Sequence, residues 1–294
     1  MKYCIADHII EVNIVNSTFA ESSLKSFAPF VTSDDSTPLC SMNVDDELHT
    51  YPKPSLRLVR DVDTGNGVIS VYRHHEEGVD VGYQFIIRDI SGYACALLKA
   101  DNIFSQCYCA LRGDEIKRTY GMNSVMMLAY AFSTGRSKTL LIHASMVRHN
   151  DMAYAFIAQS GTGKSTQVSN WLKNIPNCDL MNDDNPIFRI VDGQVIAYGS
   201  PWSGKTPCYR NVRARLGGVA KIVRDDKNFL ERLDPITSFT EILTSCSMMK
   251  WDEDLYKNMM GTVSDLVALV PVFNLHCLPN AESAIVACKG MATN

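Results

Sequence analysis

The chain has 294 residues, of which 46% are hydrophobic and 20% charged, and its formal net charge is −4. These values are typical of a globular protein with a sizeable core, arranged as one large domain or two modest ones. The acidic balance excludes a global attraction to nucleic acid or anionic membranes, and no run of about eighteen apolar residues predicts a membrane-spanning helix.

Ten cysteines are scattered along the chain without a C-x-x-C pair, and Cys107 and Cys109 are too close together for the usual zinc knuckle. At the N-terminus, Asp7, His8 and Glu11 interrupt any apolar core of a signal peptide. We therefore expect reduced thiols and a cytoplasmic protein.

Residues 1–115 are expected to form a β-rich region of unknown role. Residues 68–72 follow the turn-forming pair Asn66-Gly67, and residues 81–87 are again rich in β-branched and aromatic side chains. Both stretches predict strands.

The run His74-His75-Glu76-Glu77 contains side chains that can bind metals. Neighbouring residues on a strand point to opposite faces, so this run is a poor metal site. We expect a solvated hairpin tip.

Residues 116–294 are expected to form a second domain of the α/β (α+β) class. Residues 121–134 predict a buried helix and residues 139–147 a strand, followed by a tight turn and another strand at residues 154–158. A further hairpin is expected at residues 188–197 around the turn Asp192-Gly193. Two hairpins predict a mixed sheet with antiparallel neighbours, since a doubly wound fold would alternate strands with helices.

Between these hairpins, residues 160–166 read Ser-Gly-Thr-Gly-Lys-Ser-Thr, most of a phosphate-binding P-loop, or Walker A motif. Gly161 and Gly163 let backbone N–H groups close around phosphate oxygens, and the following helix points its positive end at them. In this pattern Lys164 reaches the outer phosphates and Ser165 ligates Mg²⁺. The residues expected to bind the nucleotide are Ser160, Gly161, Thr162, Gly163, Lys164, Ser165 and Thr166.

The alternative is an ordinary glycine turn with a solvated lysine, and the full template has a glycine where this chain has Ala158. The apolar strand before the loop and the helical spacing of Val168, Trp171 and Leu172 after it favour nucleotide binding.

Asp183 and Asp184 follow the loop lysine at a distance of nineteen and twenty positions. A phosphoryl-transfer enzyme needs one carboxylate near its metal and another that takes the proton of the acceptor. The alternative is a plain Asn-Asp-Asp-Asn-Pro turn. The glycine loop upstream favours the catalytic interpretation.

His143 lies alone in an apolar strand. Such a histidine is either a satisfied core residue or, because the neighbouring strand carries the glycine loop, a group that faces the same site. Both interpretations stay open from the residues alone.

Residues 199–205, Gly-Ser-Pro-Trp-Ser-Gly-Lys, lead into Arg210, Arg213 and Arg215. Cations beside a transferring phosphate stabilise its spreading charge, so Lys205 is a catalytic candidate. A surface loop pinned by Trp202 with a solvated basic face is the equal alternative. Beyond residue 236, helices dominate, followed by a strand near residues 270–278 and a short terminal helix.

On His143, the loop residues 160–165 and the pair Asp183-Asp184, the chain resembles the HPr kinase/phosphorylase family and, more distantly, ATP-dependent phosphoenolpyruvate carboxykinase. With Ala144, Ser145, Asn182 and residues 201–205 added, it looks like kinase-like relatives of that family found in bacterial genomes. The resemblance covers roughly residues 121–290. It implies a phosphoenolpyruvate carboxykinase-like mixed sheet with a P-loop, preceded by the β-rich N-terminal region.

The resemblance also implies residue roles. Nucleotide and Mg²⁺ would bind at Lys164 and Ser165, Asp183 would act as the general base, and Asp184 would help to hold the metal. His143 would orient or polarise the reacting phosphate. The signature for the phosphocarrier HPr and the substrate arginines of the carboxykinase are not identifiable, so fold and phosphoryl chemistry transfer better than substrate.

We therefore expect an ATP- and Mg²⁺-dependent kinase that acts on a hydroxyl, with serine of a protein, a peptide or the free amino acid as the acceptor. The alternatives are a nucleotide-dependent binding or regulatory module with little turnover and a carboxykinase-like enzyme. The expected partners are a nucleotide and the acceptor, without nucleic acid or membrane, and a homo-oligomer is compatible with the sequence.

Overall fold

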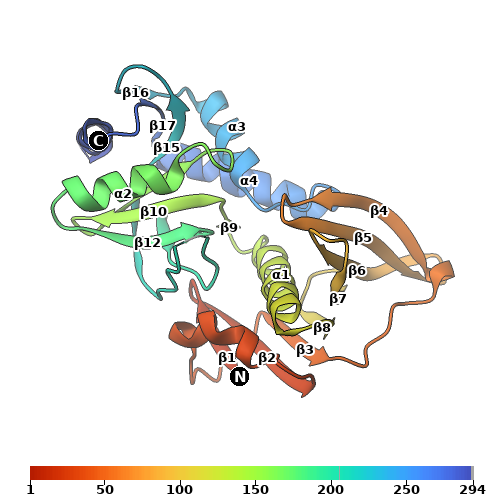
Figure 1. The fold of residues 1–294 in the computed structure, drawn as a ribbon. Coiled ribbons are helices and arrows are strands. Elements are labelled where there is room, and N and C mark those ends of the chain that lie inside the picture. The colour runs from red at the N-terminus through yellow and green to blue at the C-terminus, as the bar shows by residue number, and fades with distance from the viewer. Residues whose placement is uncertain (205, 293–294) are drawn as a thin grey trace. The chain divides into compact units, whose positions relative to one another are not determined.

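The computed structural model describes residues 1–204 and 206–292 (Figure 1). The chain divides into two compact units, Met1–Thr134 and Gly135–Asn294. The sequence analysis placed this boundary between residues 115 and 116. The division falls later because helix α1 (Glu115–Thr134) packs against strands and a 3-10 helix of the first unit.

The described residues of the first unit form an eight-stranded mixed sheet, so its β-rich character is confirmed. The strand order is β1-β2-β3-β8-β7-β6-β5-β4. The pairs β2–β3 and β3–β8 are parallel, and every other neighbouring pair is antiparallel. Its elements are β1 (Lys2–Ile5), β2 (His8–Asn16), η1 (Ser22–Phe30), β3 (Cys40–Asp45), η2 (Lys53–Ser55), β4 (Leu56–Asp63), β5 (Gly67–Glu76), β6 (Val79–Asp89), β7 (Ala94–Asp101), β8 (Gln106–Leu111) and α1.

The predicted strands at residues 68–72 and 81–87 lie in β5 and β6, which form a hairpin. The expected solvated tip is correct for Glu76 and Glu77 but wrong for His74. His74 is buried, and its ring stacks on Tyr51 with centroids 3.5 Å apart and planes at 5°. Burial lowers the pKa of His74, as expected for an imidazole that packs rather than meets water.

Residues 135–204 and 206–292 form a nine-stranded mixed sheet, as expected. Its main path is β12-β10-β11-β15-β14-β13-β9, with β17 beside β15 and β16 beside β17. Strand β11 is antiparallel to β10 and parallel to β15. The elements are β9 (Thr139–Leu141), β10 (Ala144–His149), β11 (Met152–Ile157), α2 (Lys164–Asn174), β12 (Cys178–Asp184), β13 (Ile187–Val191), β14 (Gln194–Tyr198), β15 (Arg213–Arg224), β16 (Phe229–Arg232), α3 (Pro235–Ser245), α4 (Glu253–Leu269), β17 (Val272–Cys277) and α5 (Ala281–Ala292).

Both predicted hairpins of this unit are confirmed. The β10–β11 turn has φ of 48° at Asn150 and 62° at Asp151, and the β13–β14 turn has 48° at Asp192 and 74° at Gly193. Positive φ at both central residues is the type I′ geometry that Asn, Asp and Gly accept most easily. Local turn chemistry thus determines the strand pairing on either side of the glycine loop.

The single strand predicted at residues 139–147 is wrong, because it is two strands with different partners. β9 pairs with β13, whereas β10 pairs with β11 and β12. At the break, the backbone N–H of Ile142 donates to the carbonyl of Pro186, and that of His143 donates to the carbonyl of Ser245 at 2.7 Å. These bonds to other segments replace the ladder, and they leave His143 outside both strands.

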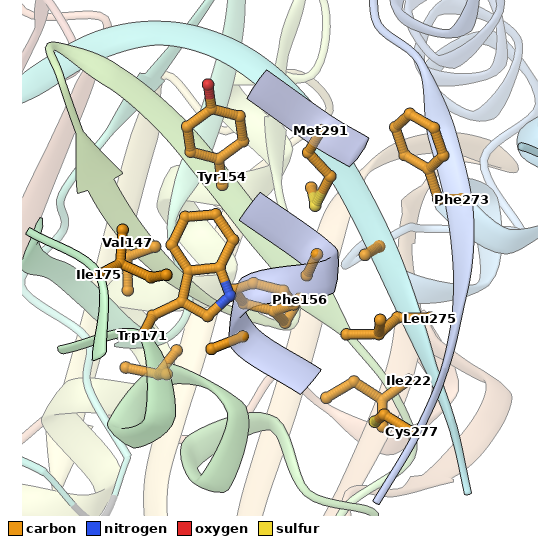
Figure 2. Packing of buried hydrophobic residues seen from close by; sticks show 14 residues of the cluster. Val147, Tyr154, Phe156, Trp171, Ile175, Ile222, Phe273, Leu275, Cys277 and Met291 are labelled. Carbon is orange, nitrogen blue, oxygen red and sulfur yellow. The ribbon is translucent and has the colours of Figure 1, made fainter. Parts of the chain in front are cut away.

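The core of the second unit gathers around Trp171, which is fully buried (Figure 2). The indole centroid lies 5.4 Å from that of Tyr154 and 5.6 Å from that of Phe156. Figure 2 shows Phe273 and Leu275 of β17 and Met291 of α5 in the same cluster. The predicted apolar helix face is correct for Val168 and Trp171 but wrong for Leu172, which is exposed. This packing holds α2, and with it the end of the glycine loop, against the sheet.

None of the ten cysteines, all of which lie within the described residues, forms a disulfide, and most are buried. The Sγ atoms of Cys40 and Cys107 lie 3.8 Å apart on neighbouring strands, and burial adds to the hydrogen bond between them in raising the pKa of Cys107. Along residues 1–204 and 206–292, no helix combines the length and the apolar character needed to cross a membrane.

Candidate functional site

The glycine loop connects the buried strand β11 to helix α2. Gly161 has a φ of 78° and Gly163 a φ of 134°, a region in which any side chain would be strained. Gly163 is the N-cap of α2, and no side chain among the described residues caps the helix there. The first turn therefore keeps its backbone donors for another acceptor, the arrangement in which helix N-termini bind anions.

Lys164 opens α2 with a buried side chain, which is 9% exposed. Its Nζ lies 2.9 Å from Nε2 of His143 and donates to the carbonyl of Ala158 at 3.0 Å. Burial lowers the pKa of Lys164, and the charges of Asp184 and Asp183 oppose this shift. The amine is thus held away from water, at a place where further negative charge would stabilise its charged form.

His143 links Lys164 to a carboxylate. Its Nδ1 lies 3.2 Å from Oδ1 of Asp184. A charged lysine can only donate, so Nε2 accepts from Lys164, and the ring proton lies on Nδ1, directed at Asp184. Of the two interpretations of His143, the structure supports the second, because the imidazole meets the lysine of the glycine loop.

Asp183 lies at the end of β12 and is 3% exposed. Its Oδ1 accepts from the Ser145 hydroxyl at 2.7 Å and from the Ser165 hydroxyl at 3.2 Å, and its Oδ2 accepts from the N–H of Thr206 at 3.2 Å. Every hydrogen bond to this side chain is one that an ionised carboxylate accepts. Asp183 is therefore a buried acceptor that joins the first turn of α2 to β10 and β12.

Asp184 differs from its neighbour in exposure and in backbone strain. Its side chain is 34% exposed, and its φ is 142°, outside the usual region for a residue with a side chain. Asn185 Nδ2 donates to its Oδ2 at 2.7 Å, while its Oδ1 faces His143. Strain of this kind persists only where the surroundings hold the residue firmly, which is common at functional sites.

The segment of residues 199–206 provides part of those surroundings. Gly204 donates its N–H to the Asp183 carbonyl, and a Cβ at Gly204 would lie 3.1 Å from that oxygen and 3.2 Å from the Cβ of Asp184. Asn182 is fully buried, and its Nδ2 donates to the Ser200 hydroxyl at 3.1 Å and to the Trp202 carbonyl at 3.0 Å. Position 204 is therefore tightly packed against both aspartates, and the segment holds the strand end that carries them.

The structure brings together most of the residues that the sequence pointed to. Lys164, Ser165, His143, Asp183 and Asp184 meet at the first turn of α2. The pairing differs in one respect, since Ser165 bonds to Asp183, whereas the sequence paired it with Asp184 as a metal ligand. Lys205, the remaining catalytic candidate, lies outside the described residues.

The arginines at positions 210, 213 and 215 are not part of this cluster. Arg210 pairs with Asp179 at 2.7 Å, at the opposite end of β12 from the aspartates, and Arg148 binds the same carboxylate at 2.9 Å. Arg213 and Arg215 lie at the start of β15. The interpretation of these three as phosphate-stabilising cations is therefore wrong.

The sequence analysis assigned no role to three groups at the site: Ser145, the Thr206 N–H and Arg224. Ser145 had a usable signal, because it lies two residues after His143 and so shares its side of an extended chain. Arg224 ends β15, which is parallel to β11, so its end lies at the same edge of the sheet as the glycine loop. It donates to the carbonyls of Gly161 at 2.7 Å and Thr162 at 3.2 Å.

The oxygen donors beside the loop are the Ser165 hydroxyl and the two carboxylates, which are the hard ligands that Mg²⁺ prefers. Among the described residues, no group of three or more His, Cys, Asp and Glu side chains is arranged to hold a metal by itself. A divalent ion would therefore need donors from a bound phosphate or from water in addition.

Comparison with known proteins assigns no family to the chain. No family model matches it, and no curated protein is significantly similar to it. The chemistry of the site therefore rests on the residues described above.

Proposed function

We propose that the chain is an ATP- and Mg²⁺-dependent phosphotransferase that acts on a hydroxyl group. The observation that carries this proposal is the meeting of the line Lys164–His143–Asp184 with the pair Ser165–Asp183 at the first turn of α2. Phosphoryl transfer depends on positioning and charge stabilisation, which a glycine loop, a buried lysine and two carboxylates supply together.

The loop amides and Lys164 bind and orient the phosphate chain. Phosphate charge beside Lys164 would oppose the effect of burial on its pKa and so favour the charged amine. His143, held between Lys164 and Asp184, fixes the position of both. Mg²⁺, when bound, neutralises charge on the phosphate oxygens, and Ser165 and Asp183 are the residues that fit it.

Asp184 is the group that accepts the proton of the attacking hydroxyl. It is accessible, whereas Asp183 is buried and already accepts three hydrogen bonds. A general base must reach the acceptor, so accessibility decides between them. This assignment exchanges the two roles that the family resemblance implied.

The finer fold assignment belongs to the same proposal: a phosphoenolpyruvate carboxykinase-like domain with a P-loop, as the resemblance to HPr kinase/phosphorylase implies. The acceptor that follows from it is serine, in a protein, a peptide or the free amino acid. We place this activity in the cytoplasm, in keeping with ten cysteines that form no disulfide among the described residues.

The test follows the γ-phosphate. Purified protein is incubated with Mg²⁺, γ-labelled ATP and host extract split into protein and small-molecule fractions, beside a Lys164→Ala control. Label in either fraction, absent with the control, establishes the kinase and the acceptor class. Label that stays in ATP refutes it in favour of a nucleotide-dependent regulatory module, and formation of phosphoenolpyruvate from oxaloacetate would identify a carboxykinase instead.

A further inference from the structure

A groove lies on the other side of the glycine loop from the aspartates. In the sheet order β12-β10-β11-β15, Asp183 and Asp184 lie on one side of β11, and β15 and β17 lie on the other. The glycine loop follows β11 directly, so one side of the loop faces the two carboxylates and the other side faces the ends of β15 and β17. The groove lies between the loop and the ends of β15 and β17.

The groove has a volume of about 300 Å³. This lies at the lower end of the range for small-molecule sites, roughly 300–1,000 Å³. One wall is the loop and the first turn of α2, and the other is mostly apolar, with Ile222 and Cys277 side by side (Figure 2). The lining residues are Gly161, Thr162, Gly163, Thr166, Gln167, Ile222, Arg224, Asp225, Cys277, Leu278 and Pro279.

Gln167 supplies an independent sign of a ligand. It is 2% exposed, and its Oε1 accepts from the Ser283 hydroxyl at 2.8 Å. Its Nε2 is buried and has no hydrogen-bond partner among the described residues. A buried donor without an acceptor is costly, so an acceptor supplied by a ligand in this groove would relieve a real deficit.

Arg224 and Asp225 place charged groups beside the apolar wall. Arg224 is bound to the loop carbonyls, and Oδ2 of Asp225 lies 2.9 Å from Nδ1 of His276. A mostly apolar cavity with a few fixed polar groups is the usual form of a small-molecule site, and a nucleoside, with its flat base and its sugar hydroxyls, fits that form.

We infer that this groove binds the nucleoside part of the nucleotide, an inference that rests on the proposed function. The terminal phosphate must lie beside the aspartates for transfer, where Lys164 and Ser165 point. The phosphate chain then follows the loop to Thr166 and Gln167, and the nucleoside leaves it on the groove side. The apolar side chains of Ile222, Leu278 and Pro279 pack against the base.

The test compares Mg-ATP with Mg-tripolyphosphate, which carries the same phosphates without a nucleoside, by calorimetric titration. The wild type should bind ATP more tightly than tripolyphosphate. Leu278→Ala, at a side chain that is 38% exposed, should weaken ATP binding about tenfold and leave tripolyphosphate binding unchanged. Leu269→Ala on α4, outside the groove and 46% exposed, is the matched control and should change neither.

Equal affinity of the wild type for both ligands would overturn the groove assignment while leaving the phosphate site intact. So would a Leu278→Ala variant that weakens both ligands to the same extent, or neither. If the wild type binds neither ligand, the proposed function itself fails, and this result is distinct from the other two.

Discussion

The amine of Lys164 lies 2.9 Å from the Nε2 atom of His143. Lys164 begins helix α2, whereas His143 lies between strands β9 and β10. The opposite ring nitrogen faces Asp184 at 3.2 Å. A buried lysine is thereby linked through an imidazole to an accessible carboxylate. Groups connected in this way should respond to substitution as one unit.

Lys164→Ala should lower the rate of phosphoryl transfer by about 10²-fold or more, because it removes the cation closest to the phosphates. His143→Ala should lower it as well, and the double variant should be no slower than the slower single variant, since residues that act as a unit are non-additive. Initial rates of label transfer measure all three. Lys173→Ala, at an exposed lysine of the same helix, is the control. Multiplying losses would show that the two residues act independently, and full activity of Lys164→Ala would refute the kinase.

The two aspartates should separate binding from turnover. Asp184→Asn should leave the affinity for Mg-ATP unchanged and lower turnover about 10²- to 10⁴-fold, because an amide cannot take the acceptor proton. Asp183→Asn should instead weaken the Mg²⁺ dependence of ATP binding, because it removes the charge beside Ser165. Calorimetric titrations with and without Mg²⁺, combined with rates, distinguish the two. The reverse pattern would restore the roles that the family resemblance implied.

Gly204→Ala should disturb turnover more than stability. Its Cβ would press on the Asp183 carbonyl and on the Cβ of Asp184, whose own backbone is strained. A displacement of the base by a fraction of an ångström should lower the rate about 10- to 100-fold. The rate and the midpoint of urea unfolding measure the two effects.

Gly261→Ala is the matched control for that variant. Gly261 is exposed within α4, and a Cβ there would have no atom within 4 Å. Alanine should raise the free energy of unfolding by about 0.5–1 kcal/mol, since it is the better helix former, without changing the rate. If both variants slow turnover equally, position 204 has no special part in holding the aspartates.

Features that follow from local chemistry could be predicted from the sequence. Asn150-Asp151 and Asp192-Gly193 accept positive φ, so they determined two hairpins and hence the mixed sheet. Gly161 and Gly163, placed between an apolar strand and a helical pattern, identified the loop.

Features that depend on distant segments could not be predicted. The strand is interrupted at His143 because the N–H of Ile142 donates to the Pro186 carbonyl and the N–H of His143 donates to the Ser245 carbonyl. No local sequence pattern encodes those partners. Arg210 is placed by its ion pair with Asp179 near the start of β12, and Arg224 by its position at the end of β15, a strand that the sequence analysis did not predict.

The adjacent aspartates show both cases at once. Alternation along a strand predicts that Asp183 and Asp184 point to opposite sides. Which side is buried depends on Ser145 and Thr206, which come from β10 and from the segment after β14. The residues alone therefore pointed to the pair without dividing the roles, and the division came only from the family resemblance.

In the first unit, Asp46 should make stability depend on pH. Burial acts to raise its pKa, but hydrogen bonds from the Leu111 N–H, Arg118 and Ser17 outweigh burial and lower it below 3.8. Arg118 lies 2.6 Å from Oδ2, and the Leu111 N–H and the Ser17 hydroxyl each lie 3.0 Å from Oδ1. A lowered folded-state pKa contributes stability that is present above 3.8 and lost as the pH falls through the folded-state value.

Asp46→Asn should therefore lower the free energy of unfolding at pH 7 by roughly 1.5–3 kcal/mol, the range for hydrogen bonds to a charged group. The difference from the wild type should shrink as the pH falls from 7 towards about 2, because the wild-type carboxyl becomes protonated as the pH approaches its lowered folded-state pKa. Urea unfolding at both pH values measures it, with Asp35→Asn in the exposed loop before β3 as the control. A difference that stays constant would mean that the neutral carboxyl, through packing, stabilises this corner as well as the ion does.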